Sequence, residues 1–305
     1  MKLDTHVHTR HSGNTSIWPL QDVMRESYNT PERVYDLARA RGMDLVTITD
    51  HDHISGACAL GRRADVVVGC EVTAVFPNDG VRVHLNVFGI DAASHAEIER
   101  LRPDIHRLLP FLQREALFTS LNHVASGING PLTAEHVAAI LPWVDGLETR
   151  NGSRLEVQNR TAEYLALATG KAMLGGSDSH TERGIGQTWT EVPGATSAES
   201  FFAGLRRGEG RAYGRHGSVG TMSSDIVRFA SNLFREQSLA AVLAPLSLRG
   251  PAMLGATLVG LPVLGLALSV GVLHFIHEQR FNRDLLDDLV TRRHVPRAKP
   301  MELAA

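Results

Sequence analysis

Short apolar runs alternate with amphipathic segments from the N-terminus to about residue 215. Apolar runs of roughly four to eight residues that stop at polar or glycine positions are typical of buried strands. The segments between them carry apolar residues at helical spacing, and Pro31, Gly42 and Gly170 stand where helix ends are expected. The predicted strands are Lys2–His6, Leu45–Thr49, Val66–Cys70, Val81–Phe88, Phe118–Leu121, Val144–Glu148 and Ala172–Leu174. The predicted helices are Pro31–Arg41, Ala93–Arg114, Ala134–Leu141, Ser153–Thr169 and Ser197–Arg207.

Strands that alternate with helices predict a parallel sheet with crossover connections. Histidine and carboxylate side chains stand at or just after the ends of most of these strands, with His84 inside its strand as the exception. In a barrel the carboxyl ends of the strands converge on one mouth, whereas an open sheet spreads them along an edge. We therefore expect a (β/α) barrel over residues 1–215.

The composition narrows the class of protein. Apolar residues make up 43% of the 305 residues, which allows a large core, and the net charge of −2 gives no reason to expect a long nucleic acid as partner. Cys58 and Cys70 lack metal-binding spacing and predict free thiols in a reducing compartment. No apolar run follows Lys2, so no signal peptide is expected and a cytoplasmic catalytic domain is predicted.

The motif Asp4-Thr5-His6-Val7-His8 is the first candidate for metal binding. Alternate residues of a strand point to the same face, so His6 and His8 can present two imidazoles to one ion. Asp4 lies on that face and could orient a ligand. A single histidine would more often be an ordinary core or surface residue.

Further histidines and carboxylates follow later strands, and none of them is accompanied by a cysteine at ligand spacing. Ligation by nitrogen and oxygen suits zinc, manganese or iron. Seven or more ligands exceed what one ion takes, so two or three divalent ions are expected, which together can activate a water. The candidate metal ligands are His6, His8, His51, Glu71, His84, His123, Asp178 and His180.

The sequence resembles the polymerase and histidinol phosphatase (PHP) family. The matching motifs, in family order over about residues 1–215, are Asp4-x-His6-x-His8, Thr49-Asp50-His51-Asp52, Gly69-Cys70-Glu71, the isolated His84 and His123, and Ser177-Asp178-Ser179-His180. The resemblance implies a distorted (β/α)7 barrel with a site for two or three metals. It assigns His6, His8, Glu71 and Asp178 to one ion, Glu71, His84 and His123 to a second, and His51 and His180 to a third.

One departure from the family pattern concerns the third ion. The family usually has an Asp or His five or six residues after the second histidine of the opening motif, where this chain has Gly13 and Asn14. His11 could substitute, although its spacing differs, and His53 has no clear family role. The third ion is therefore expected to be weakly bound or absent.

The predicted function is that of a metal-dependent phosphoesterase that uses a metal-activated water on a small phosphorylated substrate. The candidate catalytic residues are Glu71, Asp178 and Arg150, since an arginine at the end of a strand can clamp phosphate bidentately. Arg183 and Arg215 are weaker candidates for the same role. A metal-dependent amide or ester hydrolase of the same fold and a non-catalytic regulatory module stabilised by metal are the alternatives.

The end of the chain differs in composition from the rest. Residues 251–276 contain no Asp, Glu, Lys or Arg, and this apolar run is long enough to cross a bilayer once. The expected division is a catalytic barrel at 1–215, a linker or helix at 216–237, an apolar and membrane-associated helix or hairpin at 238–276, and a basic tail at 277–305. A buried helix or an oligomer interface is the alternative for the apolar part, and the hairpin is preferred slightly to a single span because basic residues flank both ends.

Overall fold

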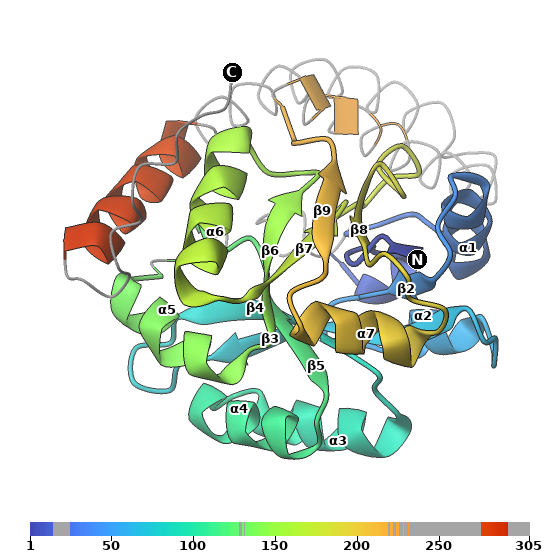
Figure 1. The fold of residues 1–305 in the computed structure, drawn as a ribbon, viewed down its shortest axis with the longest axis horizontal. Coiled ribbons are helices and arrows are strands. Elements are labelled where there is room, and N and C mark those ends of the chain that lie inside the picture. The colour runs from blue at the N-terminus through green and yellow to red at the C-terminus, as the bar shows by residue number, and fades with distance from the viewer. Residues whose placement is uncertain are drawn as a thin grey trace, which may run out of the picture.

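The computed structural model describes residues 1–14, 25–127, 130, 132–218, 220–221, 224–225, 228, 231 and 276–291. They form a mixed α/β fold in which a curled sheet is surrounded by helices (Figure 1). The strands are β1 (Lys2–Leu3), β2 (Val46–Ile48), β3 (Val66–Val75), β4 (Arg82–Phe88), β5 (Phe118–Leu121), β6 (Gly146–Asn151), β7 (Ala172–Gly176), β8 (Thr188–Glu191) and β9 (Arg211–Gly214). The helices are α1 (Pro31–Ala40), α2 (Ser55–Ala59), α3 (Ala92–Leu101), α4 (Ile105–Arg114), α5 (Ala134–Ile140), α6 (Glu156–Thr169) and α7 (Ala198–Arg206), with 3-10 turns η1 (Arg10–Ser12) and η3 (Leu141–Trp143).

The main sheet has the strand order β2-β3-β4-β5-β6-β7, and a smaller antiparallel sheet has the order β1-β8-β9. The N-terminal segment joins the two ends of the main sheet. Leu3 bridges Leu45 on the β2 side, and Val7 bridges Ser179 beyond β7. The amide of Thr49 also donates to the carbonyl of Val7 at 2.9 Å. This connection curls the sheet, so that the ends of distant strands face a common centre.

The predicted seven-stranded barrel is confirmed only in part. A mixed α/β fold with a curled sheet is present, and the predicted strands all lie in or beside it. A uniformly parallel sheet is wrong, because β4 is antiparallel to both β3 and β5. The reason is the short connection between Phe76 and Val81, where the Phe76 amide donates to the Val81 carbonyl at 2.8 Å. A tight hairpin of this kind must reverse the chain, since a parallel neighbour needs a long crossover.

The helices begin and end largely where the sequence indicated. Thr30 caps α1 by accepting from the amide of Arg33, with Pro31 at the first helical position. Gly170 ends α6 with φ of 66°, which a glycine adopts without strain. The single helix expected at 93–114 is instead two helices, α3 and α4. Pro103 lies between them, and Asp104 caps the second by accepting from the amide of His106.

The last described segment, residues 276–291, is a helix that packs on the main domain. Figure 1 shows it in red beside α5 and α6. Leu285 and Leu289 are 4% and 1% exposed and belong to the same apolar cluster as the residues of β3, β4 and α4. The sequence did not predict this helix, because the charged residues after Ile276 indicated a basic tail.

Among the described residues, no helix combines the length and apolar character that a membrane crossing requires. Apart from Ile276, the apolar segment at 238–276 lies outside the described residues. Its membrane association, the division of the chain at residues 215, 237 and 276, and the cytoplasmic location stay predictions.

Candidate metal centre

The eight predicted metal ligands come from six separate segments and meet in one cluster. His6 and His8 follow β1, His51 follows β2, Glu71 and His84 lie within β3 and β4, His123 follows β5, and Asp178 and His180 follow β7. Their ligand atoms fall into overlapping groups with all members of each group within 4.8 Å of one another. These groups are His6, His8 and Glu71; His6, His123 and Asp178; His51, Glu71 and His84; and His8, His51 and His180.

Glu71 is the hub of the cluster and is 1% exposed. Its Oε2 atom lies 3.1 Å from Nε2 of His6 and 3.2 Å from Nε2 of His8. Its Oε1 atom lies 3.1 Å from Nε2 of His123 and 3.2 Å from Nδ1 of His84. One carboxylate thus faces two sets of imidazoles with its two oxygens, which is the arrangement that lets it bridge two cations.

Asp178 faces the same cluster from the opposite side. Its Oδ1 atom is 3.7 Å from Nε2 of His6 and 3.5 Å from Nε2 of His8. Its Oδ2 atom is held by Asn151, whose Nδ2 donates at 3.1 Å, and by Arg154, whose guanidinium lies 3.1 Å away. The residue adopts φ of 50°, an uncommon conformation for a non-glycine residue. Two fixed contacts therefore leave one oxygen of Asp178 directed at the histidines.

A buried carboxylate orients His6. Nδ1 of His6 lies 2.8 Å from Oε1 of Glu148, whose Oε2 accepts from the amide of His123 at 3.0 Å. A ring nitrogen beside a carboxylate carries a proton, so Nε2 of His6 is the ring atom directed at Glu71 and the one that would bind a cation in place of a proton. Glu148 thus fixes the ring of one candidate ligand and the backbone of another.

His8 is oriented in the same way through a hydroxyl. Ser12 donates to Oδ1 of Asp50 at 2.8 Å, so its oxygen accepts from Nδ1 of His8, 3.1 Å away. Asp50 also accepts from the amide and hydroxyl of Thr9 at 2.6 and 2.7 Å. Asp50, part of the second motif, therefore braces the turn after His8.

The arrangement of His6 and His8 fits a metal ion. Their Nε2 atoms are 3.0 Å apart, and both rings have their proton on Nδ1 by the contacts above. Two lone pairs and a carboxylate oxygen of Glu71 then converge on one point, which is favourable only when a proton or a cation lies between them. Nδ1 of His84 is likewise buried and faces Glu71 without hydrogen-bond geometry. A nitrogen and oxygen donor set of this kind suits divalent zinc, manganese or iron.

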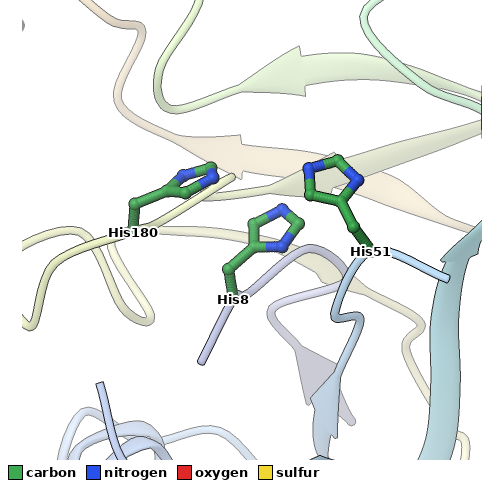
Figure 2. Close-up of side chains that lie close together, drawn as sticks. All are labelled: His8, His51 and His180. Carbon is green, nitrogen blue, oxygen red and sulfur yellow. The ribbon is translucent and has the colours of Figure 1, made fainter. Parts of the chain in front are cut away.

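The third group is formed by His8, His51 and His180, whose rings lie close together in Figure 2. The ring of His8 stacks on that of His180, with centroids 4.3 Å apart, and on that of His51, at 4.7 Å. Glu26 completes this group. Its Oε1 atom lies 3.4 Å from Nε2 of His51 and 3.8 Å from Nε2 of His180. The carboxylate that the opening motif lacks is thus supplied by a later residue.

Backbone pairing explains how Glu26 reaches this place. Asn14 forms an antiparallel bridge with Arg25, and the amide of Glu26 donates to the carbonyl of Gly13 at 3.0 Å. Glu26 therefore lies beside Gly13 and Asn14, the positions where the family usually has an Asp or His. His11 is directed elsewhere, since its Nδ1 contacts the hydroxyl of Ser55 at 2.9 Å.

The buried histidines and carboxylates of the cluster shift one another's pKa values. Burial alone would lower the pKa of His6, but Glu71, Glu148 and Asp178 raise it well above its ordinary value. Burial would raise the pKa of Glu71, but His6, His51 and His84 hold it well below its usual range. The pKa of Asp178 is lowered in the same way against burial, chiefly by His6 and Arg154. Without metal, positive charge on the histidines compensates the buried carboxylates.

Other residues singled out in the sequence lie around the cluster or away from it. Asp4 accepts from the amides of Ser177 and Gly186, and burial raises its pKa to about 6. It therefore holds the backbone beside Asp178, and its role in orienting a ligand stays a prediction. His53 is exposed, and Cys58 and Cys70 are free thiols.

Arg150 does not contact the cluster within the part of the chain that the structure describes. Its Nη1 atom donates to the carbonyl of Gly214 on β9 at 3.0 Å. The register of β6 against β7 shifts between Glu148 and Arg150, which changes the side-chain alternation. Asn151 consequently faces the cluster with Glu148, while Arg150 points to β9. Its role in phosphate binding stays a prediction.

Sequence reasoning missed Glu26, Glu148 and Arg154. Glu148 was seen only as the end of a strand, although a buried glutamate in an apolar run needs a partner. Arg154 lies four residues beyond the arginine that was chosen, at the start of the segment predicted as a helix. Glu26 stands in no motif, and only the pairing of its backbone with Gly13 reveals it.

Comparison with known proteins supports the resemblance. The family model described as PHP-associated matches residues 156–209. The protein MJ1587 of Methanocaldococcus jannaschii is 32% identical over 77 residues, which are 24% of this chain and 44% of that protein. The chain thus matches less than half the length of this curated relative.

Two solved structures were compared with this chain. PsfC from Pseudomonas syringae has a TM-score of 0.50 and 17% identity, with 78% of this chain and 98% of that chain covered. A two-domain protein of Bacteroides vulgatus that contains a predicted PHP-like metal-dependent phosphoesterase has a TM-score of 0.49 and 19% identity, with 73% and 68% covered. At such identities the likeness to PsfC shows a common fold alone.

Proposed function

We propose that this chain is a PHP family protein that acts as a metal-dependent phosphoesterase, because it matches the PHP-associated segment and gathers the PHP motif residues around one centre. The observation that carries the proposal is the position of Glu71, whose two oxygens lie 3.1–3.3 Å from five imidazoles. A buried carboxylate among so many histidines suits a cluster of cations better than a single ion.

We assign His6, His8, Glu71 and Asp178 to one ion, and Glu71, His84 and His123 to a second. Glu26, His51 and His180 would hold a third. Such ions, when bound, supply the means to activate a water and to neutralise charge on phosphate oxygens. The protein's own contribution is to hold each imidazole in one tautomer and each carboxylate in one orientation, through Glu148, Ser12 and Asn151.

The exposure of the ligands indicates the side from which a substrate would approach. His6 and His8 are fully buried, whereas the side chains of His51, His84 and His180 are 18%, 17% and 22% exposed. A phosphate would therefore meet the centre at these three residues. Catalysis by Glu71 and Asp178 is proposed in the limited sense that they hold the cations there.

Arginines near the centre support phosphate as the recognised group. Arg154 is 16% exposed and already faces Asp178. A neighbouring cavity is lined by Arg183 and Arg215 together with Ser177 and Ser179, on either side of Asp178 in the sequence. Within the described residues neither of these two guanidiniums makes a hydrogen bond or ion pair, although the carboxylate of Asp225 lines the same cavity and interacts electrostatically with Arg183. A guanidinium in such a cavity can bind a phosphate bidentately. Arg183 and Arg215, the weaker candidates for phosphate binding in the sequence, thus line the same cavity.

A turnover screen tests the function. It should use the full chain, because the helix at 276–291 contributes Leu285 and Leu289 to the core. The substrates are sugar phosphates, nucleotides, short oligonucleotides and lipid-linked phosphates, each with manganese or zinc and with chelator. We expect phosphate release that chelator abolishes and metal restores. Turnover of amide or carboxylic ester substrates alone would establish the alternative hydrolase, and metal binding without turnover would favour a regulatory module.

A further inference from the structure

The helix at 276–291 carries polar residues that are buried against the main domain. Glu278 and Asn282 are 4% and 3% exposed, at the same depth as Leu285. Burying a carboxylate is costly unless hydrogen bonds compensate it, so such a residue is retained where it has a specific partner. Glu278 has several partners, and they lie on one loop and one helix.

Glu278 contacts the loop that follows His123. Its Oε2 atom accepts from the hydroxyl of Ser126 at 2.8 Å and from the amide of Gly127 at 3.1 Å. The side-chain amide of Gln158 on α6 donates to the same oxygen. Hydrogen bonds to an ionised acceptor are among the stronger ones in proteins. One carboxylate of the C-terminal helix thus ties the loop to α6.

The loop in turn fixes a candidate metal ligand. The amide of Ser126 donates to the carbonyl of His123 at 2.9 Å. Gln158 donates to the carbonyl of Ala125 at 3.2 Å, so the loop is held along its length. His123 itself has φ of 28°, which a non-glycine residue keeps only when its surroundings enforce it.

The close approach of the two segments leaves little room for a side chain at Gly127. A Cβ atom at Gly127 would lie 3.2 Å from Oε1 of Glu278 and 3.2 Å from the ring of His277. The helix therefore sits directly on the backbone of the loop. This contact joins residues that are 151 positions apart in the chain.

We propose that Glu278 is a positioning residue of the metal centre, which holds the 123–127 loop so that His123 keeps its place beside Glu71. The inference rests on the proposed metal centre, and it goes beyond it by making one of its ligands depend on a helix from the far end of the chain. Glu278 contacts no reacting group and acts through Ser126 and Gly127.

The test compares three variants of the full chain. Glu278→Ala removes all acceptors, and Glu278→Gln keeps one oxygen in place. Asp288→Ala is the matched control, because Asp288 anchors the same helix elsewhere, by accepting from the amide of Ala134 at the start of α5 at 3.4 Å. The first readout is amide hydrogen exchange of the 118–127 region in metal-free protein, and the second is affinity for zinc or manganese, measured by competition with a chelator.

We expect Glu278→Ala to speed exchange at Ser126 and Gly127 and to weaken metal binding about 10-fold or more. Glu278→Gln should restore most of both properties. Asp288→Ala should lower thermal stability while it leaves loop exchange and metal affinity near those of the parent. If Glu278→Ala does not fold, Ser126→Ala removes the hydroxyl contact and should show the same pattern more weakly.

Two results would overturn the proposal. Unchanged exchange in the loop of Glu278→Ala or Ser126→Ala would show that Glu278 does not hold it. Equal effects of Glu278→Ala and Asp288→Ala would show that only general packing of the helix matters. Because the exchange measurement uses neither metal nor substrate, it is independent of whether the protein hydrolyses phosphate esters.

Discussion

Oε1 of Glu26 lies 3.4 Å from Nε2 of His51, although neither their sequence positions nor their motifs connect them. Burial would raise the pKa of Glu26, but His180 and His51 hold it well below its usual range. The carboxylate is therefore ionised next to imidazoles, which is the state that a metal ligand requires.

We expect Glu26→Gln to remove the third ion and to leave the other two in place. An amide is a poorer ligand than a carboxylate and carries no charge to offset the cation. Elemental analysis of the purified variant should show a loss of about one ion per chain, and Glu32→Gln, at an exposed position of α1, is the control. In the same measurement His51→Ala should retain more metal than His6→Ala. Complete loss in both histidine variants would place His51 among the ligands of the first two ions.

Glu71→Gln should cause the largest loss of metal of any single substitution. Glu71 faces imidazoles with both oxygens, so its replacement affects two ions rather than one. His6→Ala and His123→Ala should each lose less. An intact protein with two ions per chain after Glu71→Gln would contradict the bridging role.

Metal binding should release protons, and affinity should rise with pH. The pKa of His6 is raised well above 6.5 in the metal-free protein, so its imidazole stays protonated at neutral pH and a cation must displace that proton. Calorimetry in buffers of different ionisation enthalpy should give about one proton or more per chain. Zero net release at pH 7 would show that the cluster is already deprotonated.

The same shifts set the stability of the metal-free protein. His6, with a raised pKa, stabilises the fold below its ordinary value of 6.5, and this contribution is lost as the pH rises through the raised value. Glu71, with a lowered pKa, stabilises the fold above 4.5, and its contribution is lost as the pH falls through the lowered value. Without metal, the melting temperature should therefore fall toward alkaline pH. The metal-loaded protein should show a smaller fall. Parallel pH profiles for the two forms would refute this.

Arg154→Ala should reduce activity more than Arg150→Ala. Arg154 faces Asp178 at 3.1 Å, while Arg150 donates to the backbone of Gly214. Loss of a charge-assisted contact of this kind costs about 1.5–3 kcal/mol, or roughly 10- to 100-fold in kcat/KM. Steady-state kinetics, with metal content checked for each variant, make the comparison. A larger effect of Arg150→Ala would contradict this and would support Arg150, the residue that the sequence indicated, as the arginine that binds phosphate.

Much of the centre could be predicted because its residues follow strands. His6 and His8 share a face by the two-residue period of a strand, and Glu71 and Asp178 end apolar runs abruptly. Arg150 was chosen by the same rule, but a one-residue shift in β6 passed the inward position to Asn151. A bulge of this kind leaves no mark in a pattern of polar and apolar residues.

The features that could not be predicted from the sequence depend on contacts between segments that are far apart in the chain. Glu26 reaches the centre only because residues 13–14 and 25–26 lie side by side, and Glu278 only because its helix packs on α6. β4 runs antiparallel to β3 because a hairpin joins them, where the sequence pattern predicted a crossover. Each of these features is set by which segments meet in space, and the local pattern does not encode it.

The docked helix at 276–291 belongs to the same packed body as the chain up to residue 217. Gly217 bridges Leu155, and Leu289 lies in the same apolar cluster as Leu85 and Leu121. Should the apolar residues enter a bilayer, as their composition predicts, the number of crossings must be even. A hairpin satisfies this parity and a single span breaks it, because an odd crossing would pull Glu278 away from Ser126 and leave the 123–127 loop without its support. An odd number of crossings and the contact between Glu278 and Ser126 therefore exclude each other.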